Sequence, residues 1–321
     1  MAVASSKTNV IAQPGVHLKE NFAALLEANL EWAKDREWDR KLQGLKFYRQ
    51  ETTIKDHVIR QYHHGIGLVP ANRDADNLPL DNAALGFQNT ITMVTYRLAM
   101  RWERETMEDD LYGVVGPRQA KFLSALNKTI EYHTADGFNN GFGASGSAPF
   151  IAADGLYLFD TPRNASHPGV ATWSNEETAS ALTDNSLWTM DQGFADNVDE
   201  RGHIAPLIMS DIIIPKELER KAYQLARSER TPEDAMNSAN YHQGLTYHVW
   251  NYLTDANAWF GFGGDGGFQG PQNELVFIWR VRPSTMTVEV GGNPDVVSQR
   301  QRSRWAMGVD IPYAWRGNAG A

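Results

Sequence analysis

The sequence contains no cysteine among its 321 residues, so disulfide frameworks, thiolate metal sites and cysteine nucleophiles are excluded. It also lacks any apolar run of about 18 residues, which predicts that no helix crosses a membrane. The first residues, MAVASSKTNVIAQPG, lack the apolar core and cleavage site of a secretory signal. We therefore expect the chain to stay in the cytoplasm that makes it, without membrane association.

Positive charge is also scarce. Lys and Arg total 30 against 39 Asp and Glu, which gives a net charge of −9. An acidic chain is poorly suited to neutralising nucleic-acid phosphates, because that requires concentrated Lys and Arg. Lysine is missing altogether between Lys55 and Lys121.

No catalytic motif is intact. No Gly-Lys pair exists for a phosphate-binding loop, and no H-E-x-x-H exists for zinc. The stretch GFGGDG at 261–266 matches G-x-G-x-x-G only formally, because GFQGPQ follows it and cannot begin the helix that dinucleotide binding needs. GASGS at 143–147 has serine where a nucleophile elbow needs its second glycine. We expect no enzymatic activity, cofactor or metal.

Tryptophan is abundant, with ten residues. Aromatic side chains are enriched at protein interfaces. The same content would also suit a large aromatic core or a carbohydrate-binding face, so composition alone leaves these alternatives open.

Periodicity predicts a mixed α+β chain. Residues 1–17 are expected to form an arm without its own core, and strands are expected to predominate after residue 240. The expected helices are 18–43, 117–137, 182–202 and a helix opened by Pro215. The expected strands are 205–215, 244–250, 274–282, 285–290 and 303–311.

Residues 45–102 predict a projecting two-stranded arm. Its strands would be 45–64 and 87–102, joined by the loop 65–86, which is rich in Gly, Pro, Asn and Asp. A lone two-stranded ribbon is marginal in water, so such an arm needs another chain to lie on. The alternative is an ordinary hairpin within a larger sheet. In the second strand, Val94, Tyr96, Leu98, Met100 and Trp102 alternate with polar residues and would share one face.

Charged residues gather in two places. The acidic run at 103–110 is expected to be a solvated or ion-paired turn. An arginine cluster occurs near the C-terminus and would form either a nucleic-acid face or interface ion pairs. Its members are Arg280, Arg282, Arg300, Arg302, Arg304 and Arg316.

The order of several segments resembles the major head protein family typified by phage Mu. The segments are MEDDLYG, the Gly-Pro-led helix ending in DGF, DGLYLFDTPRNASHP, LTDNSLWTMDQGF, PLIMSDIIIPKELERKAYQLARSE and LTDANAWFGF. They span about residues 45–262, roughly two thirds of the chain.

This resemblance implies the capsid fold of tailed phages named after phage Hong Kong 97. It implies an N-terminal arm and helix, an extended loop over a neighbouring subunit, a peripheral domain with a long spine helix at 117–137, and an axial domain. The implied boundaries are 1–44 for the arm, 45–60 and 105–150 for the peripheral domain, 61–104 for the extended loop, 151–272 for the axial domain and 273–321 for strands returning to the peripheral domain.

The implied function is a major capsid protein that self-assembles into hexamers and pentamers of an icosahedral head around double-stranded DNA. An encapsulin-like cargo compartment and a carbohydrate-active enzyme are the alternatives. The implied partners are the chain itself, a portal and scaffold or decoration proteins, and the location is the virion after assembly in the host cytoplasm. DNA would be enclosed without sequence-specific binding.

The expected intersubunit contacts lie on the second strand of the arm. They are Val94, Tyr96, Arg97, Leu98, Met100, Arg101 and Trp102. Arg97 and Arg101, on the other face, would be free to meet the acidic run 103–110 of another subunit. Some relatives join subunits through a lysine of the extended loop, but the loop here has none, so that chemistry is not expected.

Overall fold

The computed structural model describes residues 30–31, 41–63, 65–71, 80–81, 85–109, 115–143, 151–163, 172–199, 202–231, 238–264, 266–290 and 293–321. The expected arm at 1–17 lies outside these residues. So does the expected helix 18–43, apart from Leu30 and Glu31, which are helical, and residues 41–43, which are not. No helix among the described residues is both long and apolar enough to span a membrane.

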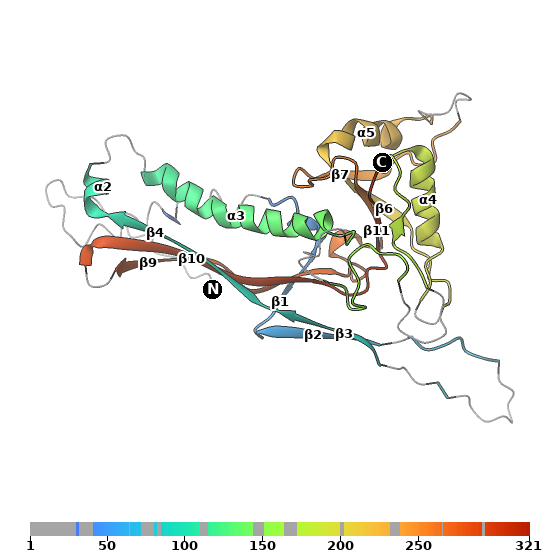
Figure 1. The fold of residues 1–321 in the computed structure, drawn as a ribbon, viewed down its shortest axis with the longest axis horizontal. Coiled ribbons are helices and arrows are strands. Elements are labelled where there is room, and N and C mark those ends of the chain that lie inside the picture. Colours follow the sequence, from blue (N-terminus) through green and yellow to red (C-terminus); the bar gives the residue numbers. More distant parts are fainter. Residues whose placement is uncertain are drawn as a thin grey trace, which may run out of the picture. The chain divides into compact units, whose positions relative to one another are not determined.

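The described elements mix helices and strands (Figure 1). The α-helices are α2 (Arg104–Glu108), α3 (Val115–Asn139), α4 (Asp184–Ala195) and α5 (Glu219–Arg227), and the 3-10 turns are η1 (Leu45–Phe47), η2 (Lys216–Leu218) and η3 (Gly267–Gln269). The strands are β1 (Arg49–Thr52), β2 (His57–His63), β3 (Leu85–Thr92), β4 (Val94–Glu103), β5 (Glu176–Glu177), β6 (Met209–Ile214), β7 (Thr246–Val249), β8 (Trp259–Gly263), β9 (Leu275–Val290), β10 (Asn293–Val309) and β11 (Trp315–Asn318).

The strands form three sheets. One has the order β1-β9-β10-β4, one has the order β5-β11-β8-β6-β7, and β2 pairs with β3 alone. β1 runs parallel to β9 and β6 runs parallel to β7, whereas β8 is antiparallel to both β6 and β11. This mixture of pairings with separate helices is an α+β fold.

The described chain forms two compact units. The first contains residues 97–124 and 284–301 together with Leu30 and Glu31, and the second contains residues 41–96, 125–283 and 302–321.

A small core holds the first unit together. Trp102 is buried with Val115 and Val297, and its indole N–H donates to Gln299 Oε1 at 2.8 Å. Leu30, Phe122 and Leu123 form a second cluster. Met100 packs against both clusters, so β4, α3 and β10 share this apolar interior.

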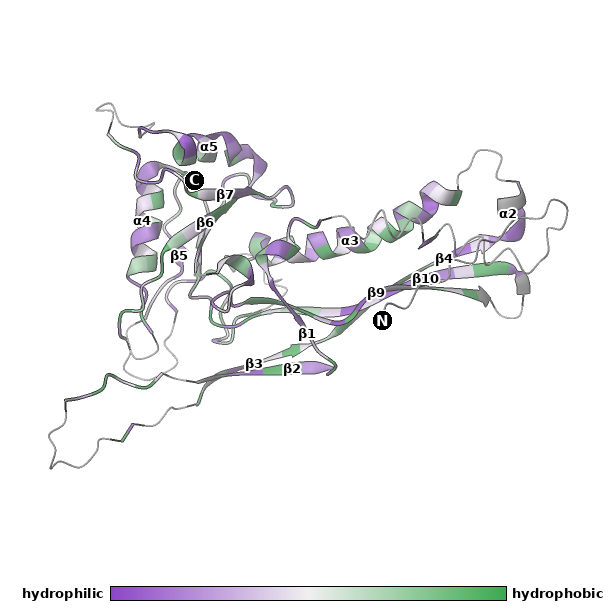
Figure 2. Ribbon diagram, turned by 180° about the vertical axis from the view of Figure 1, so that it is seen from behind, coloured by the Kyte–Doolittle hydropathy of each residue, from purple (hydrophilic) through white to green (hydrophobic). Residues whose placement is uncertain are grey.

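In the second unit the five-stranded sheet separates two cores. Ile212 and Ile214 of β6 pack with side chains of α4 and α5, whereas Ile213 faces the larger aromatic core. This division follows from the two-residue period of a strand. α4 and α5 accordingly lie beside the sheet with hydrophobic and hydrophilic residues alternating along them (Figures 1 and 2).

The two cores of this unit account for much of the tryptophan. Trp250, Trp305 and Trp315 are fully buried in the larger aromatic core, and Trp259 is fully buried in the core beside α4 and α5. The Phe138 ring lies 5.3 Å from Trp250 and 5.2 Å from Trp315, between ring centroids. The core interpretation of these tryptophans is therefore correct.

The stretch 261–266 has a packing role in this unit. Gly261 lies on β8, where an added Cβ would come within 2.5 Å of Met190 Sδ on α4. The chain then continues into the single turn η3 rather than a long helix. Glycine therefore permits close approach of helix and sheet, and the described residues that follow this stretch form only the short η3, which offers no α-helix N-terminus for a pyrophosphate.

Several sequence predictions are confirmed. α3 covers the expected helix 117–137, and β6 lies within the expected buried strand 205–215. α5 follows Pro215 after one 3-10 turn.

Other predictions need correction. The helix expected over 182–202 starts behind a capping box at Thr183 but ends at Ala195, after which the chain folds back so that the Leu207 N–H reaches the Phe194 carbonyl at 3.0 Å. The sequence predicted two strands, at 274–282 and 285–290, but the structure has a single continuous strand there, β9. Proline is tolerated at 283 because β1 pairs with β9 only as far as Trp279, and among the described residues no other strand pairs with that edge beyond it. The acidic run begins a short helix, α2, rather than a turn.

Candidate intersubunit surface

The expected two-stranded arm is only partly correct. β2 and β3 form an isolated two-stranded ribbon, but residues 94–103 form β4, which pairs with β10 in the four-stranded sheet. The predicted contact residues therefore lie on a sheet strand and not on the ribbon.

Tyr96 is already packed within its own chain. Its ring stacks on Trp305 with centroids 4.2 Å apart and planes 11° apart, and the His133 ring meets both edge-on. Burial raises the pKa of the Tyr96 hydroxyl. Burial also lowers the pKa of His133, although the nearby Asp136 charge opposes this. These contacts remove Tyr96 from the freely exposed face that the sequence predicted.

Trp102 also departs from the prediction. Only 3% of the residue is exposed, and its single donor is satisfied by Gln299. A side chain enclosed by its own chain is not available to a neighbour, so the assignment of Trp102 as an intersubunit contact is wrong. The alternation along β4 was correct, but α3 covers this part of the face.

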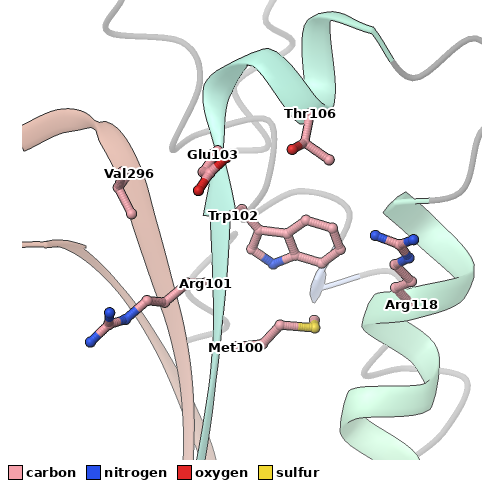
Figure 3. A pocket seen from close by; sticks show the side chains of 7 residues that line it. All are labelled: Met100, Arg101, Trp102, Glu103, Thr106, Arg118 and Val296. Carbon is pink, nitrogen blue, oxygen red and sulfur yellow. The ribbon is translucent and has the colours of Figure 1, made fainter.

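A cavity of about 490 Å³ lies beside this strand. Met100 and Trp102 point toward α3, whereas Arg101 points to the opposite side of β4 (Figure 3). The lining residues are Met100, Arg101, Trp102, Glu103, Thr106, Arg118 and Val296. One carboxylate with two arginines offers no pair of acids for general acid–base catalysis, and among the described residues no group of three His, Asp or Glu could hold a metal ion.

Four predicted contact residues stay exposed. Val94 and Leu98 are 49% and 48% exposed, and Arg97 and Arg101 are also exposed. Met100 is half-buried. Whether these side chains meet a second copy stays a prediction.

The ribbon and its described extension carry exposed apolar side chains that the sequence reasoning missed. Ile66, Leu68 and Val69 are 66%, 76% and 93% exposed, and Leu80 and Leu85 are also exposed. The signal was present within the segment read as a polar loop, where these residues interrupt the Gly, Pro, Asn and Asp. The many Gly, Pro, Asn and Asp residues of the segment indicate a polar surface loop, and the few apolar residues among them do not change that prediction.

The other side of the ribbon is packed. Ile91 and Met93 are buried with Val276 and Ile278 of β9 and Ala306 of β10. The ribbon is thus attached to the sheet near its base and exposed further along.

Ion pairs reinforce this base. Arg60 of β2 contacts Asp310 at 3.1 Å and Glu51 of β1 at 2.5 Å. Burial would raise the pKa of Glu51, but hydrogen bonds and charge from Arg60 and Arg49 hold it below its usual value. Burial raises the pKa of Asp310 despite Arg60.

A buried carboxyl lies next to these pairs. Burial raises the pKa of Glu274 to about 8, even though its oxygens accept weakly from the Ala314 N–H at 3.3 and 3.4 Å. Asp310 adds to the rise and Arg49 opposes it.

The arginine cluster is divided by the fold. Arg316 is 7% exposed and pairs internally with Glu177 at 2.6 Å. The other five lie on β9 and β10, with Arg282, Arg300 and Arg302 exposed and Arg280 and Arg304 half-buried.

Comparison with solved structures identifies the fold. The chain is similar to the capsid structure of the cyanophage P-SCSP1u, with a TM-score of 0.54 and 11% identity over 86% of each chain. It is also similar to a structure from Mycobacterium phage Patience, with a TM-score of 0.51 and 9% identity over 97% of this chain and 90% of that one. The fold is therefore of the Hong Kong 97 type, as expected.

A virus-like particle from Pyrococcus furiosus is also similar, with a TM-score of 0.47 and 13% identity over 91% of this chain and 97% of that one. This weaker likeness does not decide between a phage head and another shell.

No curated protein sequence matches the chain. The phage capsid protein family, in contrast, matches residues 88–319, which include β4, α3, the five-stranded sheet and the long β9–β10 pair. A match over most of the length, combined with the capsid fold, shows that the chain belongs to the phage capsid protein family.

Proposed function

We propose that the chain is the major capsid protein of a tailed phage and self-assembles into hexamers and pentamers of an icosahedral head that encloses double-stranded DNA. The observation that carries this proposal is the ribbon β2–β3, which continues into the exposed residues Ile66, Leu68 and Val69. Large apolar side chains exposed together mark interaction surfaces. An isolated ribbon gains stability when another chain covers it.

The domain assignment forms part of the proposal. Residues 61–104 remain the segment proposed to contact a neighbouring subunit. Within it, β4 would make its contacts as an edge strand of the four-stranded sheet and not as part of the ribbon. The arm 1–44, the peripheral parts 45–60 and 105–150, the axial domain 151–272 and the returning strands 273–321 keep the boundaries drawn from the resemblance.

The partners and location follow from the same proposal. A portal and scaffold or decoration proteins would complete the head, DNA would be enclosed without sequence-specific contacts, and assembly would take place in the host cytoplasm before the virion forms. We propose no catalytic role, because the cavity beside β4 lacks paired acids.

Assembly of the purified chain tests the proposal. Wild-type protein should form capsomers or shells that light scattering and negative-stain electron microscopy detect. Replacing Ile66, Leu68 and Val69 together with serine should leave a folded subunit that does not assemble, because an exposed side chain contributes little to the core of its own chain. The control replaces Ile204 and Ile208 with serine. These two side chains lie outside the ribbon and are as exposed as those of the ribbon extension, so the control should assemble.

Two outcomes would overturn the proposal. A stable monomer under all assembly conditions would contradict the shell function. Particles isolated from cells that contain protein cargo and no DNA would instead support a cargo compartment.

A further inference from the structure

The first unit carries three unpaired arginines on one sheet face. Arg97 and Arg101 of β4 and Arg300 of β10 are all exposed. Among the described residues none of the three forms an ion pair, whereas the neighbouring Arg104 does contact Asp295, at 3.7 Å.

The register places two of them side by side. Tyr96 of β4 stacks on Trp305 of β10 and Trp102 contacts Gln299, so a rise of six residues along β4 matches a fall of six along β10 and the strands run antiparallel in that register. Arg101 then lies opposite Arg300, on the face turned away from Trp102. Figure 3 shows Arg101 on the side of β4 opposite Met100 and Trp102.

Two arginines on adjacent strands favour binding of an anion. Like charges directly opposite one another on adjacent strands are destabilising. A carboxylate between the two guanidinium groups would offset their repulsion, because each guanidinium can donate two hydrogen bonds to a carboxylate.

The same chain offers the complementary charge. Glu103 ends β4, Glu105 lies in α2 and Asp109 directly follows α2, and all three are exposed. Among the described residues none of the three carboxylates has an ion-pair partner. Three exposed acids within seven residues are thus opposite in charge to the three exposed arginines.

We propose that the arginine face formed by Arg97, Arg101 and Arg300 binds the acidic α2 segment of a second copy of this chain. The inference rests on the proposed shell function. Because the two surfaces differ, the contact is heterologous, and repeated heterologous contacts form a ring such as a capsomer when the rotation between copies closes. The net charge of −9 favours a protein partner over nucleic acid for this face.

Charge reversal tests the contact. Arg101→Glu with Arg300→Glu should raise the protein concentration needed for assembly by about tenfold or more, because like charges then face each other across the contact. Glu105→Arg with Asp109→Arg should have the same effect. The chain carrying all four changes should assemble at a concentration near that of the wild type. Arg220→Glu with Arg227→Glu makes the same charge change as the arginine pair at two exposed positions of α5; this control should assemble normally.

The outcomes separate this inference from the proposed function. Failure of the wild type to assemble would overturn both. Normal assembly of either reversed pair would overturn only the arginine–α2 contact. The same conclusion would follow if both reversed pairs fail to assemble and the variant with all four changes fails as well. Thermal unfolding of every variant checks that the subunit is folded. If the reversed arginines leave assembly intact but abolish salt-sensitive binding of the subunit to double-stranded DNA, the face binds phosphate and the inference is wrong.

Discussion

Arg60 and Asp310 form an ion pair across 250 residues of sequence, with 3.1 Å between Nη1 and Oδ2. Arg60 belongs to the ribbon strand β2, and Asp310 follows the end of β10 in the four-stranded sheet. Glu51 of β1 shares the same guanidinium. One arginine therefore connects the base of the exposed ribbon to two strands of the sheet.

Replacing Arg60 should weaken the folded subunit. Arg60→Met leaves the partly buried carboxylates of Glu51 and Asp310 without their shared cation, so we expect the free energy of unfolding to fall by about 1–3 kcal/mol. Denaturant titration measures this. Arg227→Met, at an exposed position, should change it by less than about 0.5 kcal/mol. Equal effects of the two changes would show that the ion pairs at the ribbon base contribute little.

Glu274 should make stability depend on pH. Its pKa is about 8 in the folded chain against 4.5 for an unperturbed glutamate. Between these values the folded chain holds a proton that the unfolded chain has lost, so the contribution of this group to stability falls as pH rises from about 4.5 to about 8. Glu274→Gln cannot ionise and should stabilise the subunit by roughly 1–3 kcal/mol at pH 8 relative to its effect at pH 5. Thermal unfolding at the two pH values measures the difference, and parallel pH profiles of variant and wild type would contradict the assignment.

Trp102 should behave as a core residue. Trp102→Ala removes a buried indole and its hydrogen bond to Gln299, so we expect a loss of about 3–5 kcal/mol in unfolding free energy. Leu98→Ala, on the same strand but 48% exposed, should cost about 1 kcal/mol or less. A Trp102 variant with normal subunit stability but defective assembly would restore the interface interpretation.

An added side chain at Gly261 should destabilise the subunit. In Gly261→Ala the new Cβ would lie 2.5 Å from Met190 Sδ in a packed core, and we expect about 1–3 kcal/mol of destabilisation from overpacking. Gly116→Ala, where no atom lies within 4 Å of the added Cβ, should be neutral or slightly stabilising because it lies in α3. Chemical denaturation of both variants makes the comparison.

Assembled particles should contain no covalently joined subunits. The segment between Lys55 and Lys121 offers no amine for an isopeptide bond from the ribbon. After boiling in detergent the protein should therefore migrate as one monomer band on a gel. A ladder of larger bands that survives this treatment would mean that another lysine forms such a bond.

Local sequence was sufficient for the elements whose pattern is short-range. The Gly-Pro start and apolar period of α3, the continuous apolar run of β6 and the helix after Pro215 each depend on residues a few positions apart. The order of the segments also indicated the resemblance to phage head proteins, because the order and spacing of segments can be read directly from the sequence.

Tertiary structure decided which side chains remain available to a partner. The alternation on β4 indicated one apolar face, but the sequence could not tell whether the same chain or a neighbour covers it. Trp102 is buried through contacts with residues such as Gln299, 197 positions away, and Arg316 leaves the arginine cluster because Glu177, 139 positions away, neutralises it inside. Such pairings arise only when distant strands meet, so periodicity and composition cannot specify them. The arginine face is a further case, because only the register of β4 against β10 brings Arg101 opposite Arg300.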